Sequence, residues 1–593
     1  MKKPAASPPD FGARIRAADR VQFNLWAPDS SSIMVAIDGQ KPLPMIPAEG
    51  GRFTLEAPAR PSSTYNFITN DGRRVTDPAS RLQASDVHDA SVVVGPDSYS
   101  WHHPDWPGRP WHETVLYELH PGACGGYEGI ETMLPRLADL GITAIELMPI
   151  ADFPGRHNWG YDGVLPYAPD RAYGTRDALK HLIDAAHGRG LMVFLDVVYN
   201  HFGPDGNYLG LYASSFFRDD IKTPWGSAID YKKPQVRSFF IENALYWLNE
   251  FRFDGLRFDA VHAIGDNDFL SDMAREIRAG IAPHRMVHLV LENDDNNAQL
   301  LRTSSASPLY DAQWADDTHH CLHVLLTHEK SGYYEDYGDA ATQLARCLSS
   351  GFAYQGEVSQ HRDGARRGTR SDALPPSAFV AFLQNHDQIG NRALGERLTV
   401  LADHQALRAA ILLLLLSPQI PLIFMGEEYG ETSPFLYFTD HNDAALAAAV
   451  REGRRQEFSK FDGFRTEDAQ LQIPDPNDPA TFAASVPSFA QADVAPGSAW
   501  FAFYRAHMRL RHDLIIPRIE GARSQGAVAL ARSGVRAVWQ MGDGAVLTIA
   551  ANFGNDPLPC AAGPGAMIAA SPAGAAVHGS IAPRAAVAWL ASP

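Results

Sequence analysis

The chain has 593 residues, of which 45% are hydrophobic and 20% charged, and its formal net charge is -18. A globular chain of this length divides into about two to four domains, because a single core does not grow that large. The acidic balance argues against nucleic acid and anionic membranes as main partners, since both attract cationic surfaces, and it is compatible with a neutral substrate.

The cysteines and the apolar segments bear on the cellular compartment. The cysteines lie far apart and form no CxxC pair: Cys124, Cys321, Cys347 and Cys560. This spacing favours a reducing compartment over a disulfide framework or a zinc site. The N-terminus lacks the apolar core of a secretory signal. The strongest apolar run, residues 409–416, is too short to cross a bilayer and is followed by Pro418. We therefore expect a cytoplasmic protein.

The first part of the chain, residues 1–98, is expected to form a small antiparallel β-sandwich. Turn signals such as Asp38-Gly39 separate short segments in which apolar and polar residues alternate. These segments are residues 21–26, 33–37, 53–55 and 65–68. Tryptophans and prolines in residues 101–110 then predict a rigid linker.

From residue 115, short apolar strands alternate with amphipathic helices. Strands are expected at residues 115–119, 144–148, 192–198, 255–259, 288–291, 309–314, 378–383 and 422–425. Helices are expected at residues 130–140, 176–189, 235–251, 266–281 and 499–511. Repeated βα units of this number predict an α/β fold with a (β/α)8 TIM barrel over residues 99–514. An open doubly wound sheet is the alternative, but no glycine-rich turn follows the first strand.

Residues 515–593 are expected to form a C-terminal β-domain. Short strand-like segments lie at residues 537–540, 545–550 and 585–590, with glycine, asparagine and proline between them.

Residues 255–262 contain an arginine and a carboxylate at the end of an apolar strand. Because side chains alternate along a strand, Arg257 and Asp259 share one face. Burying either charge alone is costly, whereas a nearby guanidinium keeps a carboxylate ionised. From this stretch alone, a structural ion pair and part of a catalytic site are equally supported.

Polar residues follow four of the expected barrel strands. In a TIM barrel, chemistry takes place on the loops at the carboxyl ends of the strands. Several polar ends on one face would crowd carboxylates together, which is unfavourable unless function requires it. The third, fourth, fifth and seventh strands end in Asp196-Val-Val-Tyr-Asn-His201, Arg257-Phe-Asp259, Glu292-Asn-Asp294 and Asn385-His-Asp387.

Two carboxyl groups across a small gap are the machinery of glycoside hydrolysis. One attacks the anomeric carbon in its ionised form, and the other protonates the leaving oxygen. Arg257 favours the ionised form of Asp259, which makes Asp259 the candidate nucleophile. Glu292 follows an apolar run in which desolvation would raise its pKa, as an acid/base requires. Asp387 is suited to holding sugar hydroxyls and a distorted ring.

These four strand ends, in this order, resemble the signature regions of the α-amylase superfamily. The resemblance implies a retaining double displacement with Asp259 as nucleophile, Glu292 as acid/base and Asp387 as transition-state stabiliser. It implies that the two catalytic carboxyls lie about 5–5.5 Å apart. Asp196 would support the arginine, and Tyr161 would stack on the sugar, with a turn anchor as the alternative role for this tyrosine. Further sugar contacts would be His201, Arg257, His262, Asn385, His386 and Gln388.

Longer segments resemble the malto-oligosyltrehalose trehalohydrolase family: residues 153–163, 202–209, 332–337, 425–429 and 434–440. The resemblance implies cleavage of the α-1,4 bond next to the terminal trehalose of malto-oligosyltrehalose. It also implies malto-oligosyltrehalose synthase as the pathway partner. The alternative within enzymes is a glucan branching or glycogen debranching enzyme. Outside enzymes it is a glucan-binding scaffold with an inactive barrel, against which the presence of all three carboxylates argues.

The same family resemblance suggests substrate contacts in the segment Trp314-Ala-Asp-Asp-Thr-His-His320. The residues concerned are Asp317, His319 and His320, and the alternative for the two histidines is an ordinary polar loop. The family more often has asparagine and phenylalanine where this chain has Ala315 and Thr318. Asn200 lies where some amylases bind a structural calcium, but no dedicated acidic loop accompanies it. We expect neither a metal nor a cofactor.

Overall fold

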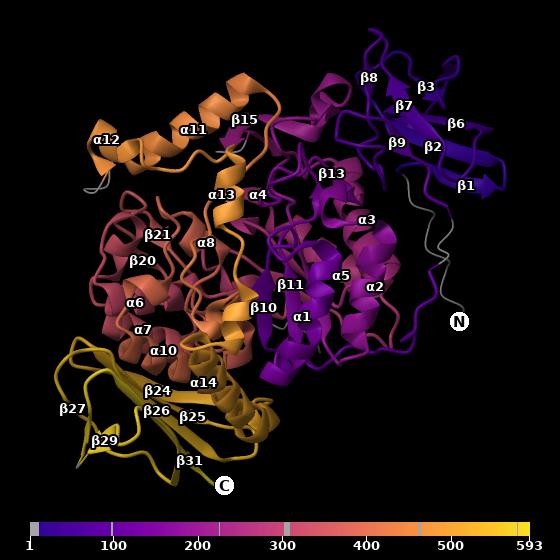
Figure 1. Ribbon diagram of the computed structural model, residues 1–593. Coiled ribbons are helices and arrows are strands. Elements are labelled where there is room, and N and C mark those ends of the chain that lie inside the picture. Colours follow the sequence, from indigo (N-terminus) through magenta and orange to yellow (C-terminus); the bar gives the residue numbers. More distant parts are fainter. Residues whose placement is uncertain (1–10, 96–98, 224–225, 302–308, 460–463, 578) are drawn as a thin grey trace.

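The computed structural model describes residues 11–95, 99–223, 226–301, 309–459, 464–577 and 579–593 (Figure 1). A barrel stands at the centre, with a small β-sandwich on one side of it and a second β-domain against its other end (Figure 1). Residues 1–10, on which the expected lack of a secretory signal partly rests, lie outside the described residues.

Eight parallel strands close the central barrel. Each strand pairs with the next in chain order, and β10 pairs with β23 to complete the circle. The strands are short, apolar and covered on both faces, as parallel strands are. This confirms the predicted (β/α)8 barrel. The strands are β10 (Leu116–Leu119), β11 (Ala144–Leu147), β14 (Met192–Val197), β17 (Gly255–Phe258), β18 (His288–Leu291), β19 (Ala312–Trp314), β22 (Phe379–Phe382) and β23 (Ile420–Phe424).

Helices surround the barrel, and side-chain caps begin several of them. Thr175, Asp266 and Asp403 accept hydrogen bonds from backbone N–H groups in the first turns of α2, α5 and α10. The outer helices are α1 (Gly126–Leu140), α2 (Arg176–His187), α3 (Pro234–Glu250), α5 (Asn267–Gly280), α6 (Asp316–Thr327), α7 (Ala340–Ser350), α10 (His404–Leu416) and α14 (Gly497–Leu510).

The strongest apolar run of the sequence forms most of α10. This helix contacts strands of the C-terminal sheet, so that its leucines are buried on all sides between that sheet and the barrel. A helix that is hydrophobic all round belongs in such a place. Within the residues that the structure describes, no helix combines the length and the apolar character needed to cross a membrane.

The predicted β-domains flank the barrel at both ends of the chain. One sheet of the N-terminal sandwich has the order β1-β2-β6-β5 and the other the order β4-β3-β7-β8, with β9 beside β7. The short strands among these are β1 (Arg14–Ala17), β4 (Leu43–Pro44), β5 (Ile46–Ala48), β8 (Arg74–Val75) and β9 (Ser91–Val92). Their main strands are β2 (Arg20–Trp26), β3 (Met34–Ile37), β6 (Arg52–Pro58) and β7 (Thr64–Ile68). The large C-terminal sheet has the order β24-β25-β26-β31-β28. Its strands are β24 (Arg523–Leu530), β25 (Gly534–Gln540), β26 (Val546–Asn552), β28 (Ala566–Ser571) and β31 (Ala585–Ala591).

The sixth barrel strand is shorter than the predicted range of 309–314. It begins at Ala312, and before it the carbonyl oxygen of Leu309 accepts hydrogen bonds from Nε and Nη2 of Arg278 rather than from a neighbouring strand.

The chain after the sixth strand contains elements that the sequence did not indicate. Helices α6 and α7 follow β19, and a hairpin of β20 (Glu357–Val358) and β21 (Arg366–Arg367) comes before β22. After β23, helix α11 (Ala444–Phe458) lies across the end of the barrel where β20 and β21 are found (Figure 1). These loop elements decide the shape of the candidate site.

Candidate active site

Arg257 is the centre of the candidate active site. It is the third residue of β17, and its side chain is fully buried. Its Nη1 lies 2.6 Å from Asp196 Oδ2 and 2.8 Å from Asp259 Oδ1, and its Nη2 lies 2.9 Å from Glu292 Oε2. The ring of Trp314 is 4.2 Å from the guanidinium and adds a cation–π contact. The buried Arg257 guanidinium thus holds three carboxylates together. Asp196 belongs to β14, and Asp259 and Glu292 directly follow β17 and β18.

Asp259 follows the last residue of β17 and is held from two sides. Arg257 binds one carboxylate oxygen, and Asn200 Nδ2 donates to the other at 2.6 Å. The next residue, Ala260, has a left-handed backbone with φ +40°, which costs an alanine about 1 kcal/mol. In this turn the Ala260 N–H donates to Glu292 Oε2 at 2.8 Å. Backbone strain of this kind is typical of functional sites.

Glu292 directly follows β18, and its side chain is 17% exposed. Burial raises the pKa of Glu292, an effect that Arg257 opposes and Asp259 reinforces. A general acid needs a raised pKa so that it still carries its proton near neutral pH. The direction of the shift and its main cause agree with the expectation from the apolar run before Glu292.

Asp387 lies on the short helix α8 (His386–Gly390), which a capping box begins. Asn385 accepts from the Asp387 N–H at 2.9 Å, and Gln388 accepts from the Asn385 N–H at 3.1 Å. Asp387 Oδ1 is 3.4 Å from His386 Nε2. Burial raises the pKa of Asp387, while His386 opposes the shift. The cap therefore fixes the backbone that presents this carboxylate.

His386 lies between acidic groups. Its Nδ1 is 2.5 Å from Glu118 Oε1, and its Nε2 is 2.7 Å from the Tyr161 hydroxyl. Burial alone would lower the pKa of His386, but Asp387 and Glu118 raise it to about 9. His386 is therefore an imidazolium at neutral pH. Its positive charge lies beside the Asp387 carboxylate.

Tyr161 and His201 form the opposite side of this cluster. The Tyr161 ring stacks on His386, with ring centroids 5.2 Å apart, and its hydroxyl donates to Asp196 at 2.7 Å. His201 Nε2 lies 2.9 Å from the Tyr161 carbonyl oxygen, and its Nδ1 lies 2.5 Å from Asn200 Oδ1. Burial lowers the pKa of His201. Tyr161 is thus anchored through its hydroxyl and remains partly exposed.

A pocket of about 290 Å³ opens beside Glu292 and Asp387. Its lining includes His262, His320 and Gln388, which the sequence proposed as substrate contacts. Asp316, which the sequence did not single out, lines it as well. Burial raises the pKa of Asp316, and the Glu292 and Asp294 carboxylates reinforce the shift. The pocket therefore offers mainly polar groups to a ligand.

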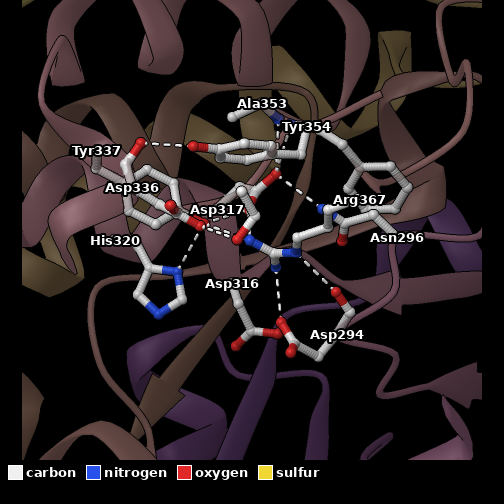
Figure 2. A network of polar contacts seen from close by, with 12 residues as sticks. Asp294, Asn296, Asp316, Asp317, His320, Asp336, Tyr337, Ala353, Tyr354 and Arg367 are labelled. Carbon is white, nitrogen blue, oxygen red and sulfur yellow. Dashed lines mark hydrogen bonds and ion pairs between the residues drawn. The ribbon is translucent and has the colours of Figure 1, made fainter. Parts of the chain in front are cut away.

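Two expected substrate contacts lie behind the pocket wall. Asp317 is fully buried and is bound by Arg367, Tyr337 and backbone N–H groups (Figure 2). His319 is fully buried, with Nδ1 2.5 Å from the Leu383 carbonyl oxygen and Nε2 3.0 Å from the Tyr334 hydroxyl. Both are placed to support the wall, and Asp316 takes the position on the pocket expected for Asp317. The rotation of α6 decides between such neighbours, and sequence alone does not fix it.

Glu118 and Trp314 are site residues that sequence reasoning missed. Glu118 belongs to β10 and binds both Nδ1 and the backbone N–H of His386. Trp314 ends β19 and lies under Arg257. A signal for Glu118 existed, because it is the one charged residue of an otherwise apolar strand. A tryptophan at the end of an apolar strand carries no such signal.

Comparisons with known proteins agree with this geometry. A family model described as "Alpha amylase, catalytic domain" matches residues 94–215, and "Domain of unknown function (DUF3459)" matches residues 522–589. The malto-oligosyltrehalose trehalohydrolase of Saccharolobus solfataricus is 42% identical over 74% of this chain and 79% of its own length. That of Deinococcus radiodurans is 40% identical over 83% of this chain and 81% of its own.

The chain belongs to the malto-oligosyltrehalose trehalohydrolase family. A crystal structure described as a putative alpha amylase from Salmonella typhimurium is 42% identical to this trehalohydrolase family member. It covers 99% of this chain and 100% of its own, with a TM-score of 0.93. The similarity therefore extends over the barrel and both β-domains.

Within this trehalohydrolase family member, two of the segments that carried the resemblance, residues 153–163 and 434–440, border the site. Trp159 packs against His386 and Phe435, and Tyr437 packs against Trp159. Among the described residues there is no group of three or more histidine, cysteine or acidic side chains arranged to hold a metal ion. Asn200, the residue weighed for calcium, uses its amide to hold Asp259.

Proposed function

We propose that this chain is a retaining glycoside hydrolase that cleaves the α-1,4-glucosidic bond next to the terminal trehalose of malto-oligosyltrehalose and releases trehalose. The observation that carries the proposal is the attachment of Asp259 and Glu292 to the same buried Arg257, in a chain whose relatives are named malto-oligosyltrehalose trehalohydrolases over most of its length.

The chemistry follows from the different surroundings of the two carboxyl groups. Asp259, held by Arg257 and Asn200, attacks the anomeric carbon and forms a covalent glycosyl ester. Glu292 gives its proton to the glycosidic oxygen, and trehalose leaves. Glu292 then takes a proton from water, which attacks the ester and frees Asp259. Asp387 holds hydroxyls of the sugar in the cleavage subsite, and the buried imidazolium of His386 lies beside it, 3.4 Å from Asp387 Oδ1.

The direct test is the product profile on a trehalose-ended oligosaccharide. Purified protein is incubated with maltotetraosyltrehalose, and products are separated by anion-exchange chromatography. We expect free trehalose together with maltotetraose. Plain maltohexaose serves as the control substrate, and it should be hydrolysed much more slowly. New α-1,6 linkages, or cleavage of branched glucan without trehalose release, would replace this proposal with a branching or debranching activity.

We also propose that malto-oligosyltrehalose synthase supplies the substrate and that both act in the cytoplasm. The acidic balance of the chain supports a neutral glucan rather than nucleic acid as the partner. Mixing the two purified proteins with maltoheptaose should yield trehalose, whereas neither protein should yield it alone. Trehalose from this protein alone would remove the need for the synthase.

A further inference from the structure

The pocket beside Glu292 lies on the side of the leaving group. A general acid stands between the sugar that is attacked and the sugar that leaves, because it protonates the oxygen that joins them. The groups around Asp259, such as Tyr161 and Asp196, do not line this pocket. Its lining begins at Glu292 and Asp387 and includes Asp294, Asp316 and His320. Under the proposed function, the pocket therefore receives trehalose.

A second buried arginine, Arg367 on β21, is one of the residues that line this pocket. Its side chain is 4% exposed, and its Nη2 binds Asp294 Oδ1 at 2.8 Å while its Nε binds the Asp294 carbonyl oxygen at 2.8 Å. Its Nη1 binds the Tyr337 hydroxyl at 2.8 Å and lies 3.1 Å from Asp317 Oδ1 (Figure 2). Arg367 thus joins the hairpin to the loop after the fifth strand and to the start of α6.

Asp317 is the anchor of this arrangement. It is fully buried, and its carboxylate is compensated by Arg367 on one oxygen and by backbone and side-chain donors on the other. Figure 2 shows these groups converging on Asp317 from separate segments. The donors to Oδ2 are the backbone N–H groups of Ala353 and Tyr354 and the side-chain amide of Asn296. A carboxylate held in this way has no freedom to follow a ligand, so it supports the wall rigidly.

The hydrogen bonds of Tyr337 fix the protonation pattern of His320. The single hydroxyl proton of Tyr337 is donated to Asp317 at 2.5 Å. The Tyr337 oxygen therefore accepts from Arg367 and, at 3.0 Å, from Nδ1–H of His320. Burial lowers the pKa of His320 well below its ordinary value, so the ring is neutral. A neutral ring with its proton on Nδ1 has an acceptor lone pair at Nε2.

We propose that Arg367 is a positioning residue for the leaving group: by joining Asp317, Tyr337 and Asp294, it presents His320 Nε2 and the Asp294 carboxylate as fixed hydrogen-bond acceptors for trehalose hydroxyls. Arg362, which also binds Asp294, holds the same carboxylate from its other oxygen. The wall then accepts hydrogen bonds from a ligand whose hydroxyls all have protons to give. This inference rests on the proposed function. It adds that Arg367 positions the side chains that bind the leaving trehalose.

The test compares Arg367→Lys and Tyr337→Phe with the neighbouring Arg366→Lys. Arg366 lies on the same strand, is exposed, and donates to the Gly356 carbonyl oxygen alone among the contacts described. We measure kcat and KM on maltotetraosyltrehalose and the inhibition constant of trehalose. In Arg367→Lys we expect KM and the trehalose inhibition constant to rise about tenfold, the effect of one lost charge-assisted hydrogen bond. We expect kcat to stay within about threefold, because Arg257 and its carboxylates are untouched.

Tyr337→Phe keeps the proposal testable if Arg367→Lys fails to fold. It removes the Tyr337 hydroxyl oxygen, so that nothing holds the His320 proton on Nδ1 any longer. The trehalose inhibition constant should then rise about fivefold. The control Arg366→Lys should match the wild type in all three constants. Trehalose inhibition unchanged in both Arg367→Lys and Tyr337→Phe would overturn the inference while leaving the proposed function intact. A wild-type protein that releases no trehalose would instead overturn the proposed function.

Discussion

The candidate site contains two buried arginines, and they lie on different kinds of structural element. Arg257 lies on a barrel strand and binds Asp196, Asp259 and Glu292. Arg367 lies on a two-residue strand of a loop hairpin and binds Asp294 and Asp317. The first sits on the rigid scaffold, and the second sits on connections between scaffold elements. In the proposed function, the residues of the chemical step therefore lie on the barrel, and the residues proposed to bind the leaving group lie on its loops.

The carboxylates around the two arginines also serve different purposes. Glu292 beside Arg257 is buried enough that its pKa rises, which suits proton transfer. Burial would raise the pKa of Asp294 as well, but Arg367 and Arg362 lower it to about 2. Asp294 is therefore always ionised and can only accept hydrogen bonds. The contrast predicts that substitutions among the residues around Arg257 mainly lower kcat, whereas substitutions among the residues around Arg367 mainly raise KM.

The largest effect is expected from Asp259→Ala. Removing the proposed nucleophile should lower kcat by roughly 10⁵-fold or more, because no other carboxylate shares its contact with Asn200. Arg257 keeps Asp196 and Glu292 as partners, so the fold should be retained. Circular dichroism with chromatographic product analysis checks both points. Substantial residual activity in a folded Asp259→Ala protein would mean that Asp259 is not the nucleophile.

Glu292→Gln should lower kcat on malto-oligosyltrehalose by about 10³-fold, the range for loss of a general acid. The loss should be much smaller on a maltosyl substrate with a 4-nitrophenol leaving group, since that group departs without a proton. In the wild type, kcat/KM should fall on the alkaline side at a pH above the ordinary range of glutamate, because burial raises the pKa of Glu292. An equal loss on both substrates would contradict the acid role.

The next largest effect is expected from replacing one buried aspartate beside each arginine, Asp196 beside Arg257 and Asp317 beside Arg367. Asp196→Asn and Asp317→Asn each leave a buried arginine with one charge fewer to bind, so each should cost about 2 kcal/mol of stability. Differential scanning calorimetry should show lowered Tm values in both variants. Kinetics should separate them, with kcat falling more in Asp196→Asn and KM rising more in Asp317→Asn. If KM instead rose more in Asp196→Asn and kcat fell more in Asp317→Asn, the assignment of different roles to the residues around Arg257 and around Arg367 would be wrong.

The smallest effect concerns the pH dependence of stability. The folded-state pKa of His386 is about 9, above its ordinary value, despite burial, because of Asp387 and Glu118. Its stabilising contribution is therefore fully present below about pH 6.5 and is lost as pH rises through about 9. Tm should fall over this interval. In His386→Asn the fall should be shallower, and an identical slope in both proteins would show that His386 does not carry the effect.

The sequence predicted the parts of the site that follow directly from strand patterning. Asp259 and Glu292, two of the candidate catalytic carboxylates, come one residue after an apolar strand, and the third, Asp387, lies in the first turn of a short helix beyond one, so the barrel fold alone brings them to the same end. Glu118 stands out as the one charged residue of an apolar strand, but its partner, His386, is 268 positions away, so nothing in the sequence links the two. The sequence predicted a substrate contact at Asp317, whereas its neighbour Asp316 lines the pocket. The rotation of α6 decides between the two, and tertiary packing sets this rotation.

Arg367 was beyond sequence reasoning for a similar reason. Its hairpin has strands of only two residues, and its contacts reach Asp294, 73 positions earlier. Its neighbour Arg366 has the same chemistry but is exposed. Only the fold of the loop decides which of the two points inward. The short β20–β21 pairing, rather than any motif, makes that choice.

The measurement that tests the central claim most directly is proton NMR of maltotetraosyltrehalose during cleavage by the wild-type protein. The account predicts that trehalose appears together with maltotetraose whose new reducing end is initially the α-anomer, since two displacements at one carbon retain its configuration. Release of the β-anomer would contradict the role of Asp259 as a covalent nucleophile. Cleavage without trehalose would contradict the proposed substrate.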